Sequence, residues 1–482
     1  QNIGDGIFVD ERSHISTEHF ESLRAHEARE GDVIVALLGD PIPRACVVPG
    51  HVGPAIVKAD CIRVRVDQAK ASSKYLTFAL NSEHVRHQAA DLVHGVGRPR
   101  LNLGELKSLS LRLAPMQEQD AIVAEIEKHL TRIDAGVAAL ERVQANLKRY
   151  RASVLKAAVE GRLVPTEAEL ARKERRDYEP ASKLLARILK ERRARWEAEE
   201  LAKLKAKGRA PTDDRWKAKY KEPEPPDTSE LPELPQGWCW ATVEQVGDVL
   251  LGRQRAPQYL TGKWFRPYLR VANIKDDAID LSDVETMDFD PTHFEKYRLR
   301  PDDILVSEGQ SPELVGQSAI YRGGVDGLCF QKTLHRFRPI AGGPSAEFAQ
   351  VVFRAHVKTG LFMKAASITT NIAHLTLEKF VAARFPLPPE REQARIVEEV
   401  ERRLALADDA ERAIRKQLAR ADRLRRSVLR QAFEGKLVSP APEADAVPVL
   451  RGQKANGSAR SPSSVQPKGR RASLPLREED AP

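Results

Sequence analysis

The chain has 482 residues, enough for two or three domains, and carries a net charge of +9 with a pI near 9.3. A basic balance fits a polyanionic partner without proving one. Four scattered cysteines without a C-x-x-C pair argue against a zinc site or a disulfide framework and for reduced thiols in the cytoplasm. No apolar run approaches 18 residues and no signal peptide is recognisable, so the sequence predicts no association with membranes.

Residues 1–112 are predicted to form a mixed domain of short strands and turns. The clearest strands are Val33–Leu38 and Cys61–Val66, and the second alternates apolar with basic or small residues. The motif at Gly31–Val35 recurs at Asp302–Val306. About 35 residues before Asn273 have no counterpart in the first half, so we expect its globular domain to be truncated at the N-terminus.

A longer stretch occurs twice without a gap. Residues 113–164 match residues 387–438 at 22 of 52 positions. Each copy opens with Pro-x-x-Glu-Gln and ends with Glu-Gly-basic-Leu-Val. A repeat of this length predicts a molecule of two equivalent halves, each a globular segment followed by a helical one.

The repeat has the apolar spacing of a coiled-coil helix, with steps of mostly three and four residues. Gln144 and Arg151 interrupt the first seam, and Glu411 and Arg425 the second. Helices at about 116–160 and 390–434 are expected, each roughly 60 Å long at about 1.5 Å per residue. Such a narrow stripe could pack on its own globular half, but the matching copies favour an intramolecular coiled coil that acts as a spacer. The seam residues are Ile122, Ile126, Leu130, Ile133, Val137, Leu140, Leu147, Val154 and Ala158, and Val400, Leu404, Ala407, Ile414, Leu418, Ala421, Val428 and Ala432.

Between the copies the sequence predicts a charged helix at about Ala181–Lys207 and an extended, exposed Pro-rich linker at Pro223–Pro235. Glu167 to Lys221 contains 18 basic and 11 acidic residues, which suits a polyanion but also a solvated helix surface. A second mixed domain follows at 236–386. The tail from Ser439 is rich in Pro, Ala, Ser, Gly and Arg without aromatics, and it is predicted to be disordered.

These features together resemble the specificity subunit of type I restriction–modification systems. The duplicated Pro-x-x-Glu-Gln helix carries most of the resemblance, and Gly237-Trp238, the Gly31-Asp32-Val33-Ile34 strand and the Glu179-Pro180-Ala181-Ser182 insert agree with it. The resemblance implies an α+β fold, with two mixed α/β target recognition domains separated by two long antiparallel coiled-coil helices in a pseudo-two-fold internal repeat. Its segments would be recognition domain 1 (1–112, truncated), long helix 1 (113–164), insert and linker (165–235), recognition domain 2 (236–386), long helix 2 (387–438) and a disordered tail (439–482).

The same resemblance implies a subunit that binds double-stranded DNA at a bipartite asymmetric site and has no catalytic centre. It would dock two methyltransferase subunits, which bind S-adenosylmethionine, and the complex would recruit ATP-dependent restriction (translocase–nuclease) subunits that use ATP and Mg. This chain would hold no cofactor or metal of its own.

DNA contacts are expected from Lys and Arg on phosphates and from polar loop residues on base edges. The turn before each long helix is rich in hydrogen-bond donors in both halves. Its residues differ between the halves, as expected of two domains that recognise different DNA sequences. For each residue, ordinary loop surface remains an alternative. The candidates are Arg44, Arg98, Arg100 and Asn102 in the first half, and Lys263, Arg266, Gln310, Ser311, Lys332, Asn371 and His374 in the second.

An enzyme is the alternative to a binding subunit, and it would require sequence signatures of its own. The sequence has no P-loop, no Gly-rich turn suited to S-adenosylmethionine and no Asn/Asp-Pro-Pro-aromatic tetrapeptide. Pro301-Asp302 followed by Glu308 resembles a nuclease motif, but Gln310 stands where its lysine belongs, and a turn into a buried strand is the simpler interpretation. His84 and His87 lack a third ligand. A structural coiled-coil adaptor with protein-binding heads remains the second hypothesis, and a free-standing nuclease or methyltransferase the third.

Overall fold

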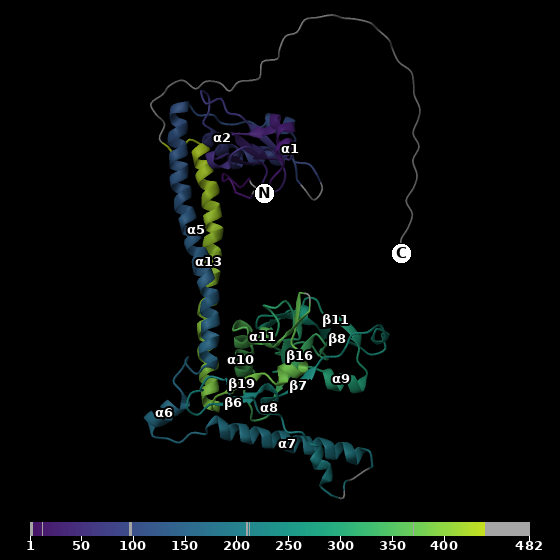
Figure 1. Ribbon diagram of the computed structural model, residues 1–482. Helices are drawn as coiled ribbons and strands as arrows, with labels where there is room; N and C mark the ends of the chain where they lie inside the picture. Colours follow the sequence, from purple (N-terminus) through teal and green to yellow (C-terminus); the bar gives the residue numbers. More distant parts are fainter. Residues whose placement is uncertain are drawn as a thin grey trace, which may run out of the picture. The chain divides into compact units, whose positions relative to one another are not determined.

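The computed structural model describes residues 3–11, 13–95, 99–208, 211, 213–369 and 371–438. The chain divides into two compact units, Gln1–Thr131 with Leu424–Pro482 and Arg132–Arg423 (Figure 1). Because both boundaries fall inside the two long helices, each unit contains part of each helix. The tail that was predicted to be disordered lies outside the described residues.

Both long helices are present: α5 spans Met116–Val159 and α13 spans Glu390–Phe433. Each is followed by a glycine with left-handed backbone, Gly161 at φ 66° and Gly435 at φ 71°. In both cases the amide after the glycine donates to the carbonyl five residues earlier. This is the Schellman ending that the Glu-Gly-basic motif predicts.

Within each unit, α5 and α13 lie side by side and antiparallel (Figure 1). In the second unit, Nη2 of Arg151 in α5 lies 2.6 Å from Oδ1 of Asp408 and 2.8 Å from Oε2 of Glu411 in α13. Arg151 and Glu411 are polar interruptions of the two predicted seams, and here they neutralise each other. In the first unit, the beginning of α5 packs on the end of α13 through Ile122, Val123, Ile126, Leu429, Ala432 and Phe433.

The charges of the two helices favour this direction. Residues 390–411 of α13 contain eight acidic and four basic residues, whereas residues 412–433 contain one acidic and eight basic. In α5, residues 116–137 contain five acidic and two basic residues, and residues 138–159 one acidic and five basic. Only an antiparallel pair places unlike halves together and avoids like-charge repulsion.

The helices also pack on the globular parts, so the alternative interpretation is partly right. Tyr75 and Ala79 share a buried cluster with α5 and α13 in the first unit. Ile396 and Val400 join the main core of the second unit. A third layer therefore covers the seam near the helix ends, while Ala407 and Ile414 are buried near the middle of α13.

The globular part of the first unit consists of short elements. A three-stranded antiparallel sheet has the order β3-β2-β5, and a separate ladder joins β1 to β4. The predicted strands at Val33 and Cys61 are thus confirmed, although each is two residues shorter than expected. The elements are α1 (Thr17–Ser22), β1 (Glu27–Ala28), β2 (Val33–Ala36), β3 (Arg44–Val47), β4 (Ala55–Ile56), β5 (Cys61–Val64), α2 (Ser73–Leu80), α3 (Glu83–Ala90) and α4 (Leu103–Ser108).

The globular part of the second unit is larger. Its central sheet has the order β14-β12-β16-β7, and three-stranded sheets β11-β8-β15 and β13-β18-β17 accompany it. The elements are β6 (Cys239–Thr242), α8 (Val243–Val246), β7 (Gly247–Leu251), β8 (Phe265–Leu269), β9 (Ile274–Lys275), β10 (Ala278–Ile279), β11 (Glu285–Asp288), α9 (Pro291–Tyr297), β12 (Ile304–Ser307), β13 (Gly309–Gln310), β14 (Ser318–Ile320), β15 (Cys329–Phe330), β16 (Leu334–Pro339), α10 (Ala346–Lys358), α11 (Leu361–Ala365), β17 (Ser367–Thr369), β18 (Ile372–His374), α12 (Leu377–Val381) and β19 (Arg384–Leu387).

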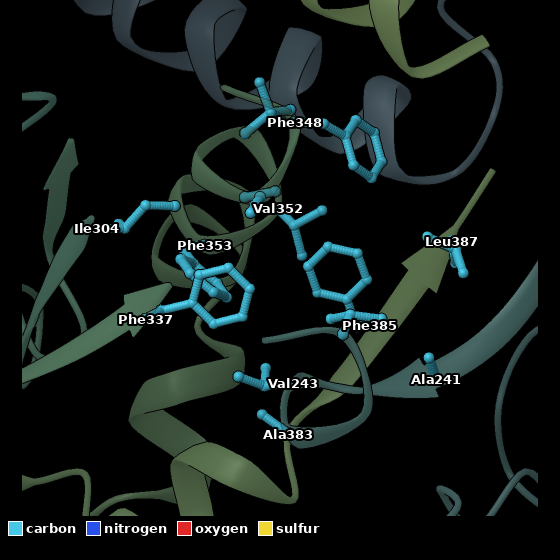
Figure 2. Packing of buried hydrophobic residues seen from close by; sticks show 14 of the residues in the cluster. Ala241, Val243, Ile304, Phe337, Phe348, Val352, Phe353, Ala383, Phe385 and Leu387 are labelled. Atoms are coloured by element: carbon cyan, nitrogen blue, oxygen red, sulfur yellow. The ribbon is translucent and has the colours of Figure 1, made fainter. Parts of the chain in front are cut away.

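An aromatic core lies between α10, the central sheet and the β19–β6 pair (Figure 2). Phe353 of α10 meets Phe337 of β16 edge-on, with ring centroids 5.1 Å apart. Phe385 of β19 closes the cluster against Phe348 and Phe353. Rings in this geometry add about 0.5–1.5 kcal/mol per pair beyond the burial of their area.

The internal repeat extends into the globular parts. β2 lies between two antiparallel partners, and β12 occupies the same place in the second unit. Each strand is entered by a turn with a left-handed residue, Gly31 or Asp302, followed by a buried aspartate. The Asp32 carboxylate accepts from the Arg29 amide, and the Asp303 carboxylate accepts from the Arg300 amide.

Each buried aspartate forms an ion pair with an arginine at the end of the neighbouring strand. Asp32 accepts from Nε and Nη2 of Arg65 at 3.1 and 3.2 Å. Asp303 accepts from Nε and Nη2 of Arg338 at 2.6 and 2.7 Å, and from the Arg300 amide at 2.7 Å. Burial alone would raise the pKa of Asp32, but the hydrogen bonds from Arg65 and the backbone outweigh it and hold the pKa below its usual range.

The charged insert contains α6 (Glu167–Glu174) and α7 (Ala181–Ala206), which matches the predicted helix closely. Leu184 and Ile188 of α7 are buried in the core of the second unit. The Pro-rich linker has no helix or strand among its described residues and is mostly exposed. It contacts the second mixed domain at Pro232, whose carbonyl accepts from Nε1 of Trp240 at 3.2 Å.

The Pro-x-x-Glu-Gln and Gly-Trp motifs meet in the second unit. Glu392 is fully buried and accepts from Nε1 of Trp238 at 2.9 Å and from the Glu167 amide at 2.8 Å. Burial raises the pKa of Glu392. The glutamine of each copy has one shared role: Nε2 of Gln119 or Gln393 donates to the carbonyl five residues earlier.

Replacement of Asp303 by alanine should destabilise the second unit by about 3 kcal/mol, because it leaves the mostly buried Arg338 guanidinium without its partner. All five tryptophans lie in this unit, so urea unfolding followed by tryptophan fluorescence reports the loss. The matched control is Asp302→Asn at an exposed position, which should change stability by no more than about 0.5 kcal/mol. Equal losses for the two variants would contradict a special role for the buried pair.

Arg151→Leu and Glu411→Leu should each weaken the helix pair, and the double variant should lose less than the sum. The partners lie in the seam with side chains only 21% and 22% exposed, so a coupling of about 1 kcal/mol or more is expected. The same double-mutant cycle on the exposed Lys156–Glu160 pair, 3.9 Å apart within α5, should give less than about 0.5 kcal/mol. Additive losses at Arg151 and Glu411 would contradict the register described above.

Candidate nucleic-acid interface

In the second unit, four candidate residues lie on or beside one small sheet. Gln310 of β13 pairs with Ala373 of β18, and Gly309 pairs with His374. β18 also pairs with β17, and Asn371 lies between those two strands. Gln310 and the adjacent Ser311 are half-buried, and the Ser311 amide donates to Oε1 of Gln310 at 3.2 Å.

Glu308 and Lys332 lie next to this sheet. Nδ1 of His374 lies 3.3 Å from Oε1 of Glu308, whose amide donates to the Thr333 carbonyl. That contact brings the exposed Lys332 beside the sheet. The arrangement offers amide, imidazole and ammonium groups at one surface, which are hydrogen-bond donors suited to base edges and phosphates.

Lys263 and Arg266 belong to a different sheet of the same unit. They lie at the start of β8, where Nζ of Lys263 is 5.7 Å from the Trp264 ring centroid and the Arg266 guanidinium is 5.0 Å from that of Phe294. Asp288 fixes this loop by accepting from the amides of Thr261 and Trp264. Trp264 and Phe265 remain 38% and 44% exposed, so the loop presents an aromatic and cationic surface.

In the first unit, Arg44 and Arg100 both contact the backbone of Leu38. Arg100 forms β-bridges with Leu38 and with His94, and Nη2 of Arg44 donates to the Leu38 carbonyl at 3.3 Å. Arg44 also donates to the Asp40 carbonyl, so its guanidinium supports the loop after β2. Arg100 is exposed and is the better placed of the two for a phosphate.

Asn102 has a structural role. Its Oδ1 accepts from the Glu105 amide while the Glu105 carboxylate accepts from the Asn102 amide, a capping box that starts α4. Its counterpart in the repeat, Thr376, caps α12 with its hydroxyl, which accepts from the Lys379 amide. Arg98, the remaining candidate of the first half, lies outside the described residues.

The two halves therefore build equivalent ladders from different side chains. The Leu38–Arg100 bridge after β2 corresponds to the Gly309–His374 pair after β12. The His94–Arg100 bridge corresponds to the β17–β18 pairing. Shared backbone pairing with unlike side chains is the pattern expected of two heads that read different sequences.

Asp302 and Glu308, which resembled part of a nuclease motif, contact other side chains of the protein. Oδ1 of the exposed Asp302 lies 3.0 Å from Nη1 of Arg322, and Oε1 of Glu308 lies 3.3 Å from Nδ1 of His374. Within the described ranges, no group of three or more His, Cys, Asp or Glu side chains could hold a metal ion. In the same ranges the four cysteines are free thiols, and no helix has the length and apolarity needed to cross a membrane.

Two exposed residues on the β17–β18 hairpin were not predicted from the sequence. Ile368 and Ile372 are 58% and 49% exposed. Neither has the polar or charged group by which the sequence predicts DNA contacts.

Residues 235–420 match the family described as the type I restriction modification DNA specificity domain. The EcoKI specificity subunit of Escherichia coli K12 is 21% identical over 370 residues, covering 76% of this chain and 66% of that protein. The EcoBI specificity subunit of Escherichia coli is 24% identical over 397 residues, covering 80% and 70%. This chain thus spans just under two thirds of the length of the EcoKI subunit.

A chain from a solved structure of a type I R-M system shares the fold, with a TM-score of 0.57, 18% identity and coverage of 85% of this chain and 83% of that one. The long helices with their C-terminal glycine caps, the duplicated strand entry and the matched segment agree with one another. Residues 235–420 thus match the DNA specificity domain of type I restriction–modification systems, and most of the chain is similar to the specificity subunits of such systems.

Proposed function

We propose that this chain is the sequence-specific DNA-binding subunit of a type I restriction–modification complex and recognises a bipartite asymmetric site. Each half reads one half-site with the ladder that follows β2 or β12. The observation that carries the proposal is that these ladders share their backbone pairing and differ in their side chains. An adaptor that bound one protein twice would keep equivalent surfaces alike.

The chain contributes recognition and no chemistry of its own. It docks two methyltransferase subunits, which use S-adenosylmethionine, and the assembly recruits restriction (translocase–nuclease) subunits that use ATP and Mg. Its place is the cytoplasm, where its free thiols stay reduced. A coiled-coil adaptor with protein-binding heads is the alternative that the experiments below separate from this function.

The antiparallel helix pair is proposed as the spacer between the two reading heads. Both helices have 44 residues, about 66 Å of continuous helix at about 1.5 Å per residue. Their pairing through Arg151, Asp408 and Glu411 opposes sliding, because a shift would separate these charges. A fixed register makes the distance between half-sites part of the recognised sequence.

Cells that express this chain with its neighbouring methyltransferase should carry a methylated bipartite motif with a fixed non-specific gap. Single-molecule sequencing of their DNA measures this directly. Cells with the methyltransferase alone are the control and should lack the motif. A single half-site would mean that only one head reads DNA, and no motif at all would favour the adaptor.

Lengthening both helices by three heptads at their centres should lengthen the gap while leaving both half-sites unchanged. Twenty-one residues add about 32 Å, close to one DNA turn of roughly 34–36 Å, so both heads would still face the same side of the duplex. The same insertion in α5 alone should abolish assembly, because the two seams no longer match. An unchanged gap with intact binding in the doubly lengthened chain would refute the spacer role.

A further inference from the structure

The β17–β18 hairpin presents two large apolar side chains to solvent. Thr369 pairs with Ile372 and Ile368 pairs with Ala373. Because side chains alternate along each strand, Ile368 and Ile372 lie on opposite faces of the ribbon. Their exposed fractions of 58% and 49% place both outside the core.

The fold does not need these side chains. β18 is held from its other side by β13, through the Gly309–His374 and Gln310–Ala373 pairs. Ala373 is fully buried, and the Leu375 amide donates to the Glu308 carbonyl at 2.7 Å. The ribbon is therefore positioned by backbone pairing and by neighbours other than the two isoleucines.

The equivalent ladder of the first unit has polar groups. His94 occupies the place of Ile368 by the repeat alignment, bridges to Arg100 and has a side chain 52% exposed. The repeat alignment thus places an imidazole in one half where the other half has the isoleucine at position 368, whereas Arg100 corresponds to His374. Sites for a shared protein partner would not diverge in this way, but heads for different base pairs would.

We propose that Ile368 and Ile372 read the 5-methyl groups of thymines in the second half-site, with the hairpin entering the major groove edge-on so that both faces of the ribbon meet base edges. This rests on the proposed DNA-binding function. A two-stranded ribbon fits the major groove, and the thymine methyl is the apolar group exposed on base edges there. Asn371, between the isoleucines, has the amide that pairs with the N6 and N7 atoms of the partner adenine.

Cations beside the hairpin suit the flanking phosphates. Nζ of Lys379 donates to Oγ of Ser367 at the base of β17, and the exposed Lys332 lies near β13. Phosphate contacts of this kind orient a protein on the duplex without reading its sequence. The lysines would thus orient the protein on the duplex, and the isoleucines of the same surface would read the methyl groups.

The test uses the full chain co-purified with its methyltransferase subunits and a duplex that carries the mapped motif. Deoxyuridine in place of thymidine removes only the 5-methyl group. Replacing contacted thymines of the second half-site should weaken binding by about fourfold per methyl. The same replacement in the gap should have no effect.

The matching protein variant is Ile368→Ala combined with Ile372→Ala. It should bind the thymine duplex less tightly than the unmodified chain and should no longer distinguish uracil from thymine. Leu281→Ala removes another exposed apolar side chain elsewhere in the second unit and should retain the full uracil effect. The hairpin backbone pairs do not involve these side chains, so the variant should fold.

The outcomes separate this inference from the function on which it rests. A second half-site without thymine, or site-selective binding that uracil leaves unchanged, overturns the methyl readout and leaves the proposed function standing. An equal uracil effect in the double variant also overturns it, since other residues would then contact the methyls. Absence of any site-selective binding by the unmodified chain would overturn the proposed function itself.

Discussion

Because α5 and α13 run in opposite directions, each compact unit combines the beginning of one helix with the end of the other. The first unit shows the consequence. Tyr75, from the first half of the sequence, meets the ring of Phe433 at the end of α13 with centroids 5.4 Å apart. Nη1 of Arg112 donates to the carbonyl of Phe433. The second unit has the reciprocal arrangement, since Leu155 of α5 is fully buried in its core. Neither half can complete its core without a helix from the other, so the helix pairing constrains everything built upon it.

In each globular part, the residues that hold the backbone in place are different from the residues whose side chains face solvent. The turn before β2 or β12, with its left-handed residue and buried aspartate, is the same in both. The aspartate is bonded to an arginine on the neighbouring strand, where an unpaired charge would be costly. These contacts determine the ladder that follows each strand. The side chains that project from the ladder are not needed to hold the backbone, and they differ between the halves.

The sequence predicted the long helices because their signals are local and repeated. Pro-x-x-Glu-Gln, the apolar steps and the final glycine each act within one turn, and the observed bounds differ from the predicted ones by one residue. The pairing of Trp238 with Glu392 joins positions 154 residues apart, so no local pattern could reveal it. Candidate contacts were harder for a different reason. Arg44 and Asn102 have the chemistry of DNA contacts, but Arg44 donates to loop carbonyls and Asn102 caps α4. Residue type alone cannot separate a donor that is already engaged from one that is available.

Exposed apolar residues, like polar ones, can contribute to a surface that recognises DNA bases. An isoleucine buried in the core is explained by the stability it contributes, whereas Ile368 and Ile372 leave much of their surface in water. Single exposed apolar residues are common on protein surfaces and need no explanation. Here two of them flank an amide on a ribbon that backbone pairing already holds, at the place where the other half carries His94. The contrast with the repeat, rather than exposure alone, marks them. In a duplicated protein each half serves as the internal reference for the other, because shared residues identify the scaffold and divergent exposed residues identify the function.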